Sequence, residues 1–460
     1  MKKYLSMLLT IALVLSLLTG CGSGSAGVPE TTPETGEIAA TDPISEETVK
    51  EETPEEWLIA QMNEIIADPE HPLMAAAIGV IKDGEIIFAE AVGNKNLDGE
   101  SATGDTKYRI ASISKLNTAI GVWQLIEQGL IDPDADASEY LGFELKNPNF
   151  PDTPITVRML LSHTSSIREG DYSIPYGRHI SEYFTPGKIL YYKDCWAPAE
   201  EAPGEYFSYC NMNYCLIGTI IERVSGERFD QYMVNHVFKP MGLSCSFNVS
   251  EMSPEAQAQV GTLYRKYNAA GRYDPVNGRW TAQCDDFTHG YPSTDYSEYE
   301  IGTNGSLFGP MGSLRISTRE LCEIMLMFCN GGSYNGVQIL KPETIEAMFT
   351  PVWTYDPALE NGDTYWGLMT CYGAGPHIFT NTDMGDRMII GQDLPFAGHT
   401  AEAYGLLGGM GFDRETGNGI VYIVAGTGCN PNEYYGEYSA FYGWEEALLT
   451  AGITYAEFDY

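Results

Sequence analysis

Apolar and polar residues alternate with two different periods along most of the chain. Apolar residues spaced three and four apart predict an amphipathic helix over 57–66, and apolar, β-prone runs over 74–81 and 85–92 predict two strands. Lys82-Asp83-Gly84 between these runs is typical of a hairpin turn. This order, continued to the C-terminus, predicts one sheet closed by both ends of the folded part. The further elements predicted are helices over 112–127, 213–224, 318–329 and 436–450 and strands over 364–371, 388–390, 403–412 and 419–424.

The first twenty residues do not belong to this pattern. Two lysines precede an apolar run over 5–18, which is typical of a secretory signal over residues 1–20. The run ends in Leu18-Thr19-Gly20-Cys21, which resembles the bacterial lipobox, so we expect cleavage before Cys21 and lipidation of that cysteine. The alternative is an ordinary secretory signal that is cleaved nearby. With lipidation, the protein is extracytoplasmic and anchored to the cell membrane.

A polar and acidic segment follows over 21–54. It consists largely of Gly, Ser, Thr, Pro and Glu, so it cannot bury enough apolar area to offset its chain entropy. We therefore predict a disordered linker between the lipid anchor and a folded domain over 55–460. Since no later run holds 18 consecutive apolar residues, Cys21 is the expected membrane attachment.

The charge balance excludes two kinds of partner. The chain carries 63 Asp and Glu against 26 Lys and Arg, a formal net charge of −37. Binding of nucleic acid is excluded because it requires a basic face that displaces counterions from phosphates. Adhesion to an anionic membrane surface through basic patches is excluded for the same reason.

The cysteines do not predict a disulfide framework. With Cys21 lipidated nine remain, so at least one is unpaired. Cys322 and Cys329 lie seven apart on a predicted helix, a rise of about 10.5 Å, which is too far for a bridge. The chain has no Cys-x-x-Cys pair and no close Cys/His cluster with metal-ligand spacing. We expect mostly buried thiols, no metal and no cofactor.

The first candidate for chemistry is Ser112-Ile113-Ser114-Lys115, the only Ser-x-x-Lys in the chain. On a helix the serine and the lysine project from one face, and Ser112 in the first turn would lie where free amides favour negative charge. A desolvated lysine can remove the proton of a serine hydroxyl and make it a nucleophile. Taken alone, such a match is usually an N-cap serine beside a solvated lysine.

Two more motifs follow in chain order. Tyr209-Cys210-Asn211 is the only Tyr-x-Asn and precedes a predicted helix; its tyrosine can shuttle the serine proton to a leaving group. His399-Thr400-Ala401-Glu402 precedes a predicted strand, where backbone amides can face an oxyanion. Taken singly, a turn tyrosine that packs its ring and a structural histidine explain these residues as well.

Together and in this order, the three motifs resemble the active-site set of the penicillin-recognising serine hydrolases, in the branch of class C β-lactamases, D,D-peptidases and esterases. The resemblance covers about residues 57–450 and includes Leu161-Ser162-His163-Thr164-Ser165 and Phe238-Lys239-Pro240-Met241-Gly242. It implies an α/β (α+β) fold with an antiparallel sheet flanked by helices, a mostly helical subdomain, and an active site between them. The sheet part would cover about 55–110 and 301–460, and the helical and inserted part about 111–300.

The resemblance also implies an acyl-enzyme mechanism. Ser112 would attack a carbonyl group, with Lys115 and Tyr209 forming the base system. The backbone amides of Ser112 and Glu402 would form the oxyanion hole, and water would then hydrolyse the ester. His163 would be a structural residue beneath the site.

The resemblance implies Asn211, His399, Thr400 and Glu402 for substrate binding and the oxyanion hole, with Asn211 hydrogen-bonded to the lysine or to the substrate amide. This third motif departs from a frequent Lys-Thr-Gly form. Because an unperturbed histidine is mostly neutral at neutral pH, anchoring of a substrate carboxylate by His399 is less assured. Ala401 adds a methyl group near the oxyanion amide. Glu402 would disfavour anionic substrates if it points inward. The His-Thr form looks more like the esterase and D-amino-acid peptidase members.

We therefore expect a cell-envelope serine hydrolase that cleaves a peptide, amide or ester bond of a small-molecule or peptide substrate through an acyl-enzyme on Ser112. The alternative is a non-hydrolytic protein of the same fold that binds or senses penicillin or peptidoglycan fragments. The complete set of Ser112, Lys115, Tyr209 and Asn211 favours catalysis, whereas the altered third motif favours binding. The cavity walls are expected to come from the aromatic stretches 168–208 and 265–300.

Overall fold

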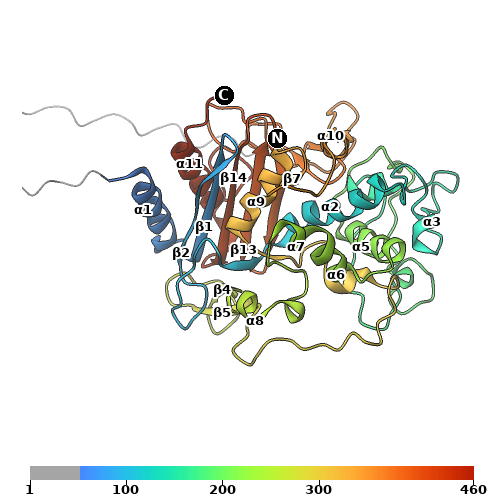
Figure 1. The fold of residues 1–460 in the computed structure, drawn as a ribbon, viewed down its shortest axis with the longest axis horizontal. Coiled ribbons are helices and arrows are strands. Elements are labelled where there is room, and N and C mark those ends of the chain that lie inside the picture. Colours follow the sequence, from blue (N-terminus) through green and yellow to red (C-terminus); the bar gives the residue numbers. More distant parts are fainter. Residues whose placement is uncertain (1–51) are drawn as a thin grey trace, which may run out of the picture. The chain divides into compact units, whose positions relative to one another are not determined.

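The computed structural model describes residues 52–460, so the expected signal, Cys21 and most of the linker lie outside the described residues. The centre of the fold is a ten-stranded sheet in which eight strands follow the antiparallel order β2-β1-β14-β13-β12-β11-β10-β9 (Figure 1). Strands β4 and β5 form a hairpin that joins the end of β14. The strands of this sheet are β1 (Leu73–Lys82), β2 (Glu85–Gly93), β4 (Leu263–Tyr267), β5 (Arg279–Cys284), β9 (Trp353–Thr354), β10 (Cys371–Tyr372), β11 (His377–Ile378), β12 (Ala397–Ala403), β13 (Leu406–Asp413) and β14 (Asn418–Thr427).

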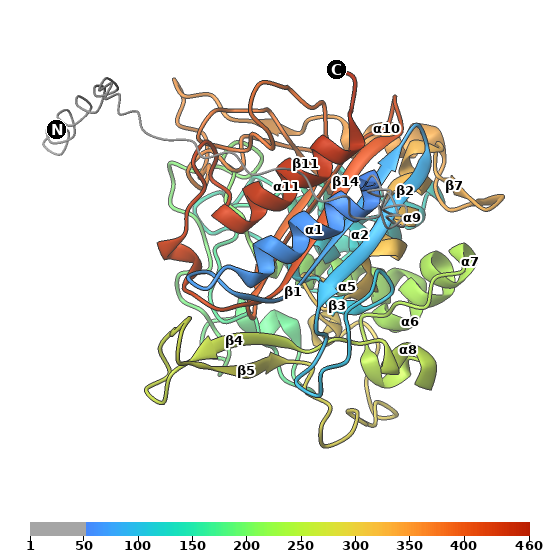
Figure 2. The same ribbon diagram turned by 90° about the vertical axis from the view of Figure 1, so that its left-hand side faces the viewer.

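Helices cover both faces of the sheet. Helices α1 (Pro54–Ala67) and α11 (Gly443–Ala456) pack together on one face, and α9 (Thr318–Cys329) packs on the other (Figures 1 and 2). Alternate residues of β1 therefore enter two different cores, with Ile78 and Val80 on the α1–α11 side and Ala77 and Ile81 on the α9 side. This explains why β1 is an unbroken apolar run, since a strand covered on both faces needs apolar residues at every position.

The helical part lies beside the sheet, where α2 (Ser114–Glu127) packs against α5 (Asn211–Ser225) (Figure 1). Both helices are almost entirely buried, so their positions relative to the sheet are set by the main core. The other helices are short: α3 (Ser138–Leu141), α4 (Val157–Leu161), α6 (Phe229–Met233), α7 (Lys239–Met241), α8 (Pro254–Ala258) and α10 (Pro342–Phe349). Two small strand pairs, β3 (Lys107–Arg109) with β6 (Arg315–Ser317) and β7 (Ser333–Tyr334) with β8 (Val337–Gln338), complete the fold.

Local sequence signals explain the elements that were predicted well. The turn between β1 and β2 has positive φ at Asp83 and Gly84, as the predicted hairpin requires. Helix α9 begins with a capping box between Ser317 and Glu320. Helix α5 ends at Gly226 in the left-handed conformation.

Several predicted elements are wrong. The stretch 364–371 forms turns, with positive φ at Tyr365 and Trp366, and only its last residue enters a strand. The stretch 388–390 is not a strand. The strand predicted over 403–412 begins at Leu406, because residues 404–405 form the turn that joins it to β12, a strand that was not predicted. The segment 265–300 lies in the part predicted to be helical and inserted, yet it supplies most of the β4–β5 hairpin, so the sheet also draws on that part.

The last helix starts seven residues later than predicted, at Gly443 instead of Gly436. The carboxylate of Glu446 accepts hydrogen bonds from the backbone amides of Glu437, Tyr438 and Ser439. These bonds hold the segment in a loop that competes with helix formation.

The predicted fold class, an α/β (α+β) arrangement with an antiparallel sheet flanked by helices, is confirmed. The nine cysteines in the described part of the chain are free thiols and seven of them are buried, which confirms the expectation of mostly buried thiols. Over residues 52–460, no helix has the length and apolar character needed to cross a membrane.

Candidate active site

Ser112 lies in a 3₁₀ turn, η1 (Ala111–Ile113), directly before α2. The α-helix therefore begins two residues later than predicted, and Ser112 precedes it rather than lying in its first turn. Ala111 has a φ of 44°, an uncommon value for a residue with a side chain. This conformation turns the chain sharply from β3 into α2 and presents Ser112 at the end of the helix.

Lys115 contacts Ser112 directly, with 3.0 Å between Nζ and the serine Oγ. Its Nζ also donates to the Asn211 Oδ1 at 2.6 Å and to the backbone carbonyl of Met311 at 2.8 Å. The side chain is completely buried, and none of these three acceptors carries a charge. Burial lowers the pKa of Lys115 to about 7, against the opposing charge of Glu169.

Tyr209 lies against the same lysine. Its ring centroid is 4.9 Å from Lys115 Nζ, and its hydroxyl is buried without a hydrogen-bond partner among the described residues. Burial raises the pKa of Tyr209 well above its ordinary value, although the neighbouring Ser112 side chain acts in the opposite direction. The phenol is therefore protonated at neutral pH.

His163 stacks on the other side of Tyr209, with 4.3 Å between ring centroids. Its Nδ1 accepts the backbone N–H of Cys210 at 3.1 Å. Burial, with the charge of Lys115 as the next cause, lowers the pKa of His163 well below its ordinary value. The neutral ring thus supports the Tyr209 loop from beneath, as predicted.

His399 does not enter the cavity beside Ser112. Its buried ring accepts the Tyr372 hydroxyl at Nε2, 2.8 Å away, and donates from Nδ1 to the Thr400 carbonyl at 2.6 Å. Burial lowers the pKa of His399 well below its ordinary value, so the imidazole is neutral. The structure therefore does not bear out the expectation that the His399 side chain faces a substrate.

Thr400 and Glu402 do line the cavity, and β12 lies against η1. In the two-residue hairpin that joins β12 to β13, Ala403 and Leu406 are the hydrogen-bonded pair next to the turn. Pairs alternate along an antiparallel ladder, so the backbone amide of Glu402 points away from β13. It faces the free edge of β12, on the side of η1 and Ser112. The methyl group of Ala401 is accommodated in the main core.

The cavity in front of Ser112 has a volume of about 770 Å³. Its lining includes Ser112, Tyr209 and Asn211, and its outer wall comes from residues 365–369, Met384 and residues 432–445. The expectation that 168–208 and 265–300 form the walls is therefore wrong. Among the described residues no Lys, Arg or His lines this cavity, whereas Glu402 and Glu445 do.

The two carboxylates of the cavity are connected through Tyr442. The Tyr442 hydroxyl donates to Glu402 at 3.3 Å, and the Tyr442 backbone N–H donates to Glu445 at 3.0 Å. Burial raises the pKa of both carboxyl groups, that of Glu445 to about 7. β12 and α11 thus each contribute an acidic side chain to a cavity whose lining is otherwise mostly apolar and aromatic.

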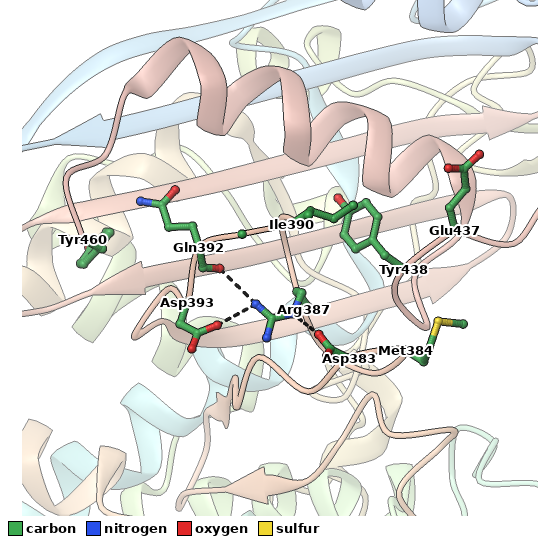
Figure 3. Close-up of a pocket in the computed structure, with 10 residues that line it drawn as sticks. Asp383, Met384, Arg387, Ile390, Gln392, Asp393, Glu437, Tyr438 and Tyr460 are labelled. Atoms are coloured by element: carbon green, nitrogen blue, oxygen red, sulfur yellow. Dashed lines mark hydrogen bonds and ion pairs between the residues drawn. The ribbon is translucent and has the colours of Figure 1, made fainter.

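A second hollow of similar size, about 760 Å³, lies on the surface beside α11 (Figure 3). Three of its charged groups pair with one another, since Arg387 donates to Asp383 and to Asp393, each at 2.6 Å. It contains no serine–lysine pair, so the chemistry is assigned to the cavity that holds Ser112.

Glu169 is a member of the site that the sequence did not indicate. Its carboxylate accepts hydrogen bonds from the backbone N–H and from the side-chain amide of Asn211. It belongs to none of the three motifs, and no local pattern around it marks it.

The described residues contain no group of three His, Cys, Asp or Glu side chains able to hold a metal ion.

Comparisons with known proteins agree with this arrangement. Residues 61–441 match the model of the Beta-lactamase family. Protein flp of Staphylococcus aureus (strain N315) is 29% identical over 176 residues, which cover 37% of this chain and 34% of that protein. Penicillin-binding protein 4 of Amycolatopsis lactamdurans is 30% identical over 186 residues, which cover 40% of this chain and 46% of that protein. The matches thus span less than half the length of these curated relatives.

Solved structures share the fold at lower identity. An octameric penicillin-binding protein homologue from Pyrococcus abyssi has a TM-score of 0.58 at 24% identity, over 82% of this chain and 74% of that chain. D-amino acid amidase from Ochrobactrum anthropi SV3, complexed with D-phenylalanine, has a TM-score of 0.59 at 19% identity, over 86% of this chain and 99% of that chain. The family match extends over most of the folded part and includes all three motifs. The chain therefore belongs to the beta-lactamase family.

Proposed function

We propose that the protein is a cell-envelope acyl hydrolase that forms an acyl-enzyme on Ser112. The observation that carries this proposal is the buried 3.0 Å contact between Lys115 Nζ and Ser112 Oγ. With a pKa lowered to about 7, Lys115 is partly neutral at neutral pH. A neutral amine can accept the serine proton while its two N–H groups still donate to Asn211 and Met311.

The reaction then follows from the positions of these groups. Ser112 Oγ attacks the carbonyl carbon as its proton moves to Lys115, and the oxyanion that forms faces the backbone amides of Ser112 and Glu402. Collapse of this intermediate expels the leaving group, which takes a proton from the Tyr209 hydroxyl while Lys115 returns a proton to the tyrosine. A water molecule hydrolyses the ester and restores Ser112. Because Tyr209 is protonated at neutral pH, Lys115 rather than a tyrosinate is the base.

The cavity favours one class of acyl donor. It has no cationic side chain among its described lining residues, so a carboxylate beside the scissile bond lacks a partner. Glu402 carries both an amide that faces the oxyanion and a carboxylate in the same cavity, which places negative charge close to the reacting carbonyl. We therefore favour substrates that are neutral or carry a protonated amine near that carbonyl, as aminopeptidase and esterase types do, over a D,D-carboxypeptidase or a penicillin hydrolase.

The location is also a proposal. The lipobox-like segment before Cys21 supports lipidation of that cysteine and attachment to the outer surface of the cell membrane. The acidic linker would then hold the catalytic domain away from the lipid surface.

Covalent labelling tests the nucleophile. The purified chain is incubated with a fluorophosphonate and its intact mass is measured beside the Ser112→Ala variant. We expect one adduct per wild-type chain and none on the variant, because only a serine whose proton has been removed reacts at an appreciable rate. An adduct of equal yield on both proteins, or turnover of an activated ester that the variant retains in full, would refute the proposal.

Substrate selectivity tests the acidic wall. For amino-acid p-nitroanilides, wild type should prefer a free α-amine over the N-acetylated form, and Glu402→Gln should reduce this preference about three- to tenfold through the loss of one partly screened charge. The variant keeps the backbone amide, so turnover of the acetylated substrate should change little. Glu433→Gln is the matched control, because Glu433 belongs to the wall segment 432–445 but is exposed and is not one of the residues that line the cavity. Equal preferences in all three proteins would contradict the role given to Glu402.

The alternative is a non-hydrolytic protein that binds penicillin or peptidoglycan fragments. The neutral, buried His399 in place of a lysine is the observation that favours it. Incubation with a penicillin decides between the two. A Ser112 adduct that persists without release, together with no ester turnover, would favour the binding protein.

A further inference from the structure

Glu169 lies in the segment between α4 and α5, 42 residues before Asn211 in the chain, yet its carboxylate meets both donors of that residue. Asn211 is the first residue of α5, so its backbone N–H has no acceptor within the helix. Glu169 Oε2 accepts this N–H, and Oε1 accepts the side-chain amide Nδ2 at 2.7 Å. The carboxylate thus caps the helix and holds the side chain of its first residue at the same time.

This contact decides which way the Asn211 amide faces. An ionised carboxylate only accepts hydrogen bonds, so the NH₂ group of Asn211 must point to Glu169. The carbonyl oxygen, Oδ1, is then left to face Lys115, where it accepts the ammonium at 2.6 Å. With the amide reversed, an NH₂ group would face the lysine and the contact would be lost.

We infer that Glu169 is a positioning residue for the proposed reaction: it orients the Asn211 amide toward Lys115 and supplies a carboxylate to the surroundings of that lysine. This inference rests on the proposed function, since it concerns how Lys115 is prepared to act as a base.

Among the described groups around Lys115, the negative charge comes from Glu169. In the described part of the chain, the groups that face this lysine or interact with its charge come from four elements besides its own helix. Apart from Glu169 they are phenols, thiols, neutral imidazoles, a side-chain amide and a backbone carbonyl, and burial raises the pKa values of the phenols and thiols and lowers those of the imidazoles. These groups are His163, Tyr209, Cys210, Asn211, Tyr214, Cys215, Met311 and His399. Among the described residues, Glu169 is thus the carboxylate whose charge opposes the effect of burial on Lys115.

The test is the pH dependence of kcat/KM for an activated ester in wild type and in Glu169→Gln. In wild type the acid limb should fall near pH 7, because Lys115 must lose its proton before it can accept one from Ser112. Without the carboxylate the lysine releases its proton more readily, so the acid limb of Glu169→Gln should move to lower pH by at least about half a unit. The plateau should also fall about tenfold, because glutamine presents an NH₂ group to one of the two Asn211 donors.

Two further variants separate charge from geometry. Glu169→Asp keeps the charge on a shorter side chain, so its plateau should fall while its acid limb stays close to that of wild type. Asp171→Asn removes an equal charge from the same segment; Asp171 is exposed and its carboxylate caps Ser173, so neither the limb nor the plateau should move. Thermal unfolding of each variant, measured at each pH, identifies the pH range in which the variant is folded. The pH profiles are compared within that range.

An unchanged acid limb in Glu169→Gln, or an equal shift in Asp171→Asn, would overturn the inference. If Glu169→Gln does not fold, an unchanged plateau in Glu169→Asp overturns it instead. These results differ from failure of the proposed function, which would appear as equal activity in wild type and Ser112→Ala before any variant at position 169 is made.

Discussion

Two buried lysines, eight positions apart in the chain, have different surroundings and different expected roles. Lys107 in β3 is 2% exposed and its Nζ lies 2.5 Å from Glu320 Oε2, whereas Lys115 in α2 is completely buried and contacts only uncharged acceptors. Although burial acts to raise it, the charge of Lys107 and several hydrogen bonds hold the pKa of Glu320 below its ordinary value. The uncharged acceptors around Lys115 offset less of the cost of burying its charge, so the pKa of Lys115 falls to about 7.

The comparison shows that burial alone does not make a lysine a base. A carboxylate in direct contact pairs with a buried lysine and makes the pair part of the framework, here joining β3 to the start of α9. Neutral acceptors satisfy the N–H groups of a lysine without stabilising its charge to the same extent, so the proton becomes available for chemistry. The position of the nearest carboxylate, rather than depth in the core, separates the two roles.

The largest expected effect is on activity. Lys115→Met should lower kcat/KM for an activated ester about 10³-fold, because Ser112 loses its base while the fold keeps its packing. Steady-state hydrolysis measures the effect, and near-ultraviolet circular dichroism confirms the fold. The Ser112→Ala/Lys115→Met double variant should be no slower than either single variant, since the two residues act as a unit. More than a tenth of wild-type activity in Lys115→Met would remove the distinction between the two lysines.

The next effect is on stability. Lys107→Met should lower the free energy of unfolding by about 3–5 kcal/mol, because Glu320 would remain buried without its cation. Urea denaturation measures this loss of stability. At temperatures at which the variant is folded, its ester turnover should equal that of wild type. Lys107→Met/Glu320→Gln should recover part of the loss, since the glutamine leaves no buried charge. A Lys107→Met protein as stable as wild type would show that the pair is not a structural ion pair of this strength.

The smallest effect is the contribution of Lys115 to the pH dependence of the free energy of unfolding. In the unfolded chain this lysine keeps its proton up to its ordinary pKa of 10.5, whereas in the folded protein it releases the proton near pH 7. Between these values the unfolded state binds more protons, so folding becomes more favourable as pH rises. The difference in unfolding free energy between wild type and Lys115→Met should therefore rise by up to about 1.4 kcal/mol per pH unit from pH 7.5 to pH 9.5. A flat difference would mean that Lys115 is charged in the folded state.

Much of the fold could be predicted because several elements carry strong local signals. The runs that became β1 and β2 are apolar and β-prone, and those that became α2, α5 and α9 have helical patterns. Ends of these elements are marked by Asp83-Gly84, Ser317 with Glu320, and Gly226. The errors fall where local pattern and long-range contacts disagree. The stretch around Trp366 has strand-like composition but forms turns, and its indole is 88% exposed at the cavity. The start of α11 was displaced by the side chain of Glu446, which no short pattern could have indicated.

For the site, the sequence by itself determined which reactive groups are present. The spacing of three between Ser112 and Lys115 brings the pair within 3.0 Å, because a turn of helix places such residues on one side. The order of the motifs identified Tyr209 and Asn211 as candidates, and Asn211 lies 2.6 Å from Lys115 although 96 residues separate them in the chain.

Only the tertiary structure decided the charges, the walls and the supports of the site. It turned His399 away from the cavity as a neutral ring, brought Glu169 to Asn211, and built the outer wall from residues 365–369 and 432–445. It also lowered the pKa of Lys115 by removing water while leaving Lys107 beside a carboxylate. The physical reason is that local spacing fixes geometry over a few residues, whereas protonation and recognition depend on solvent and on partners that distant parts of the chain supply.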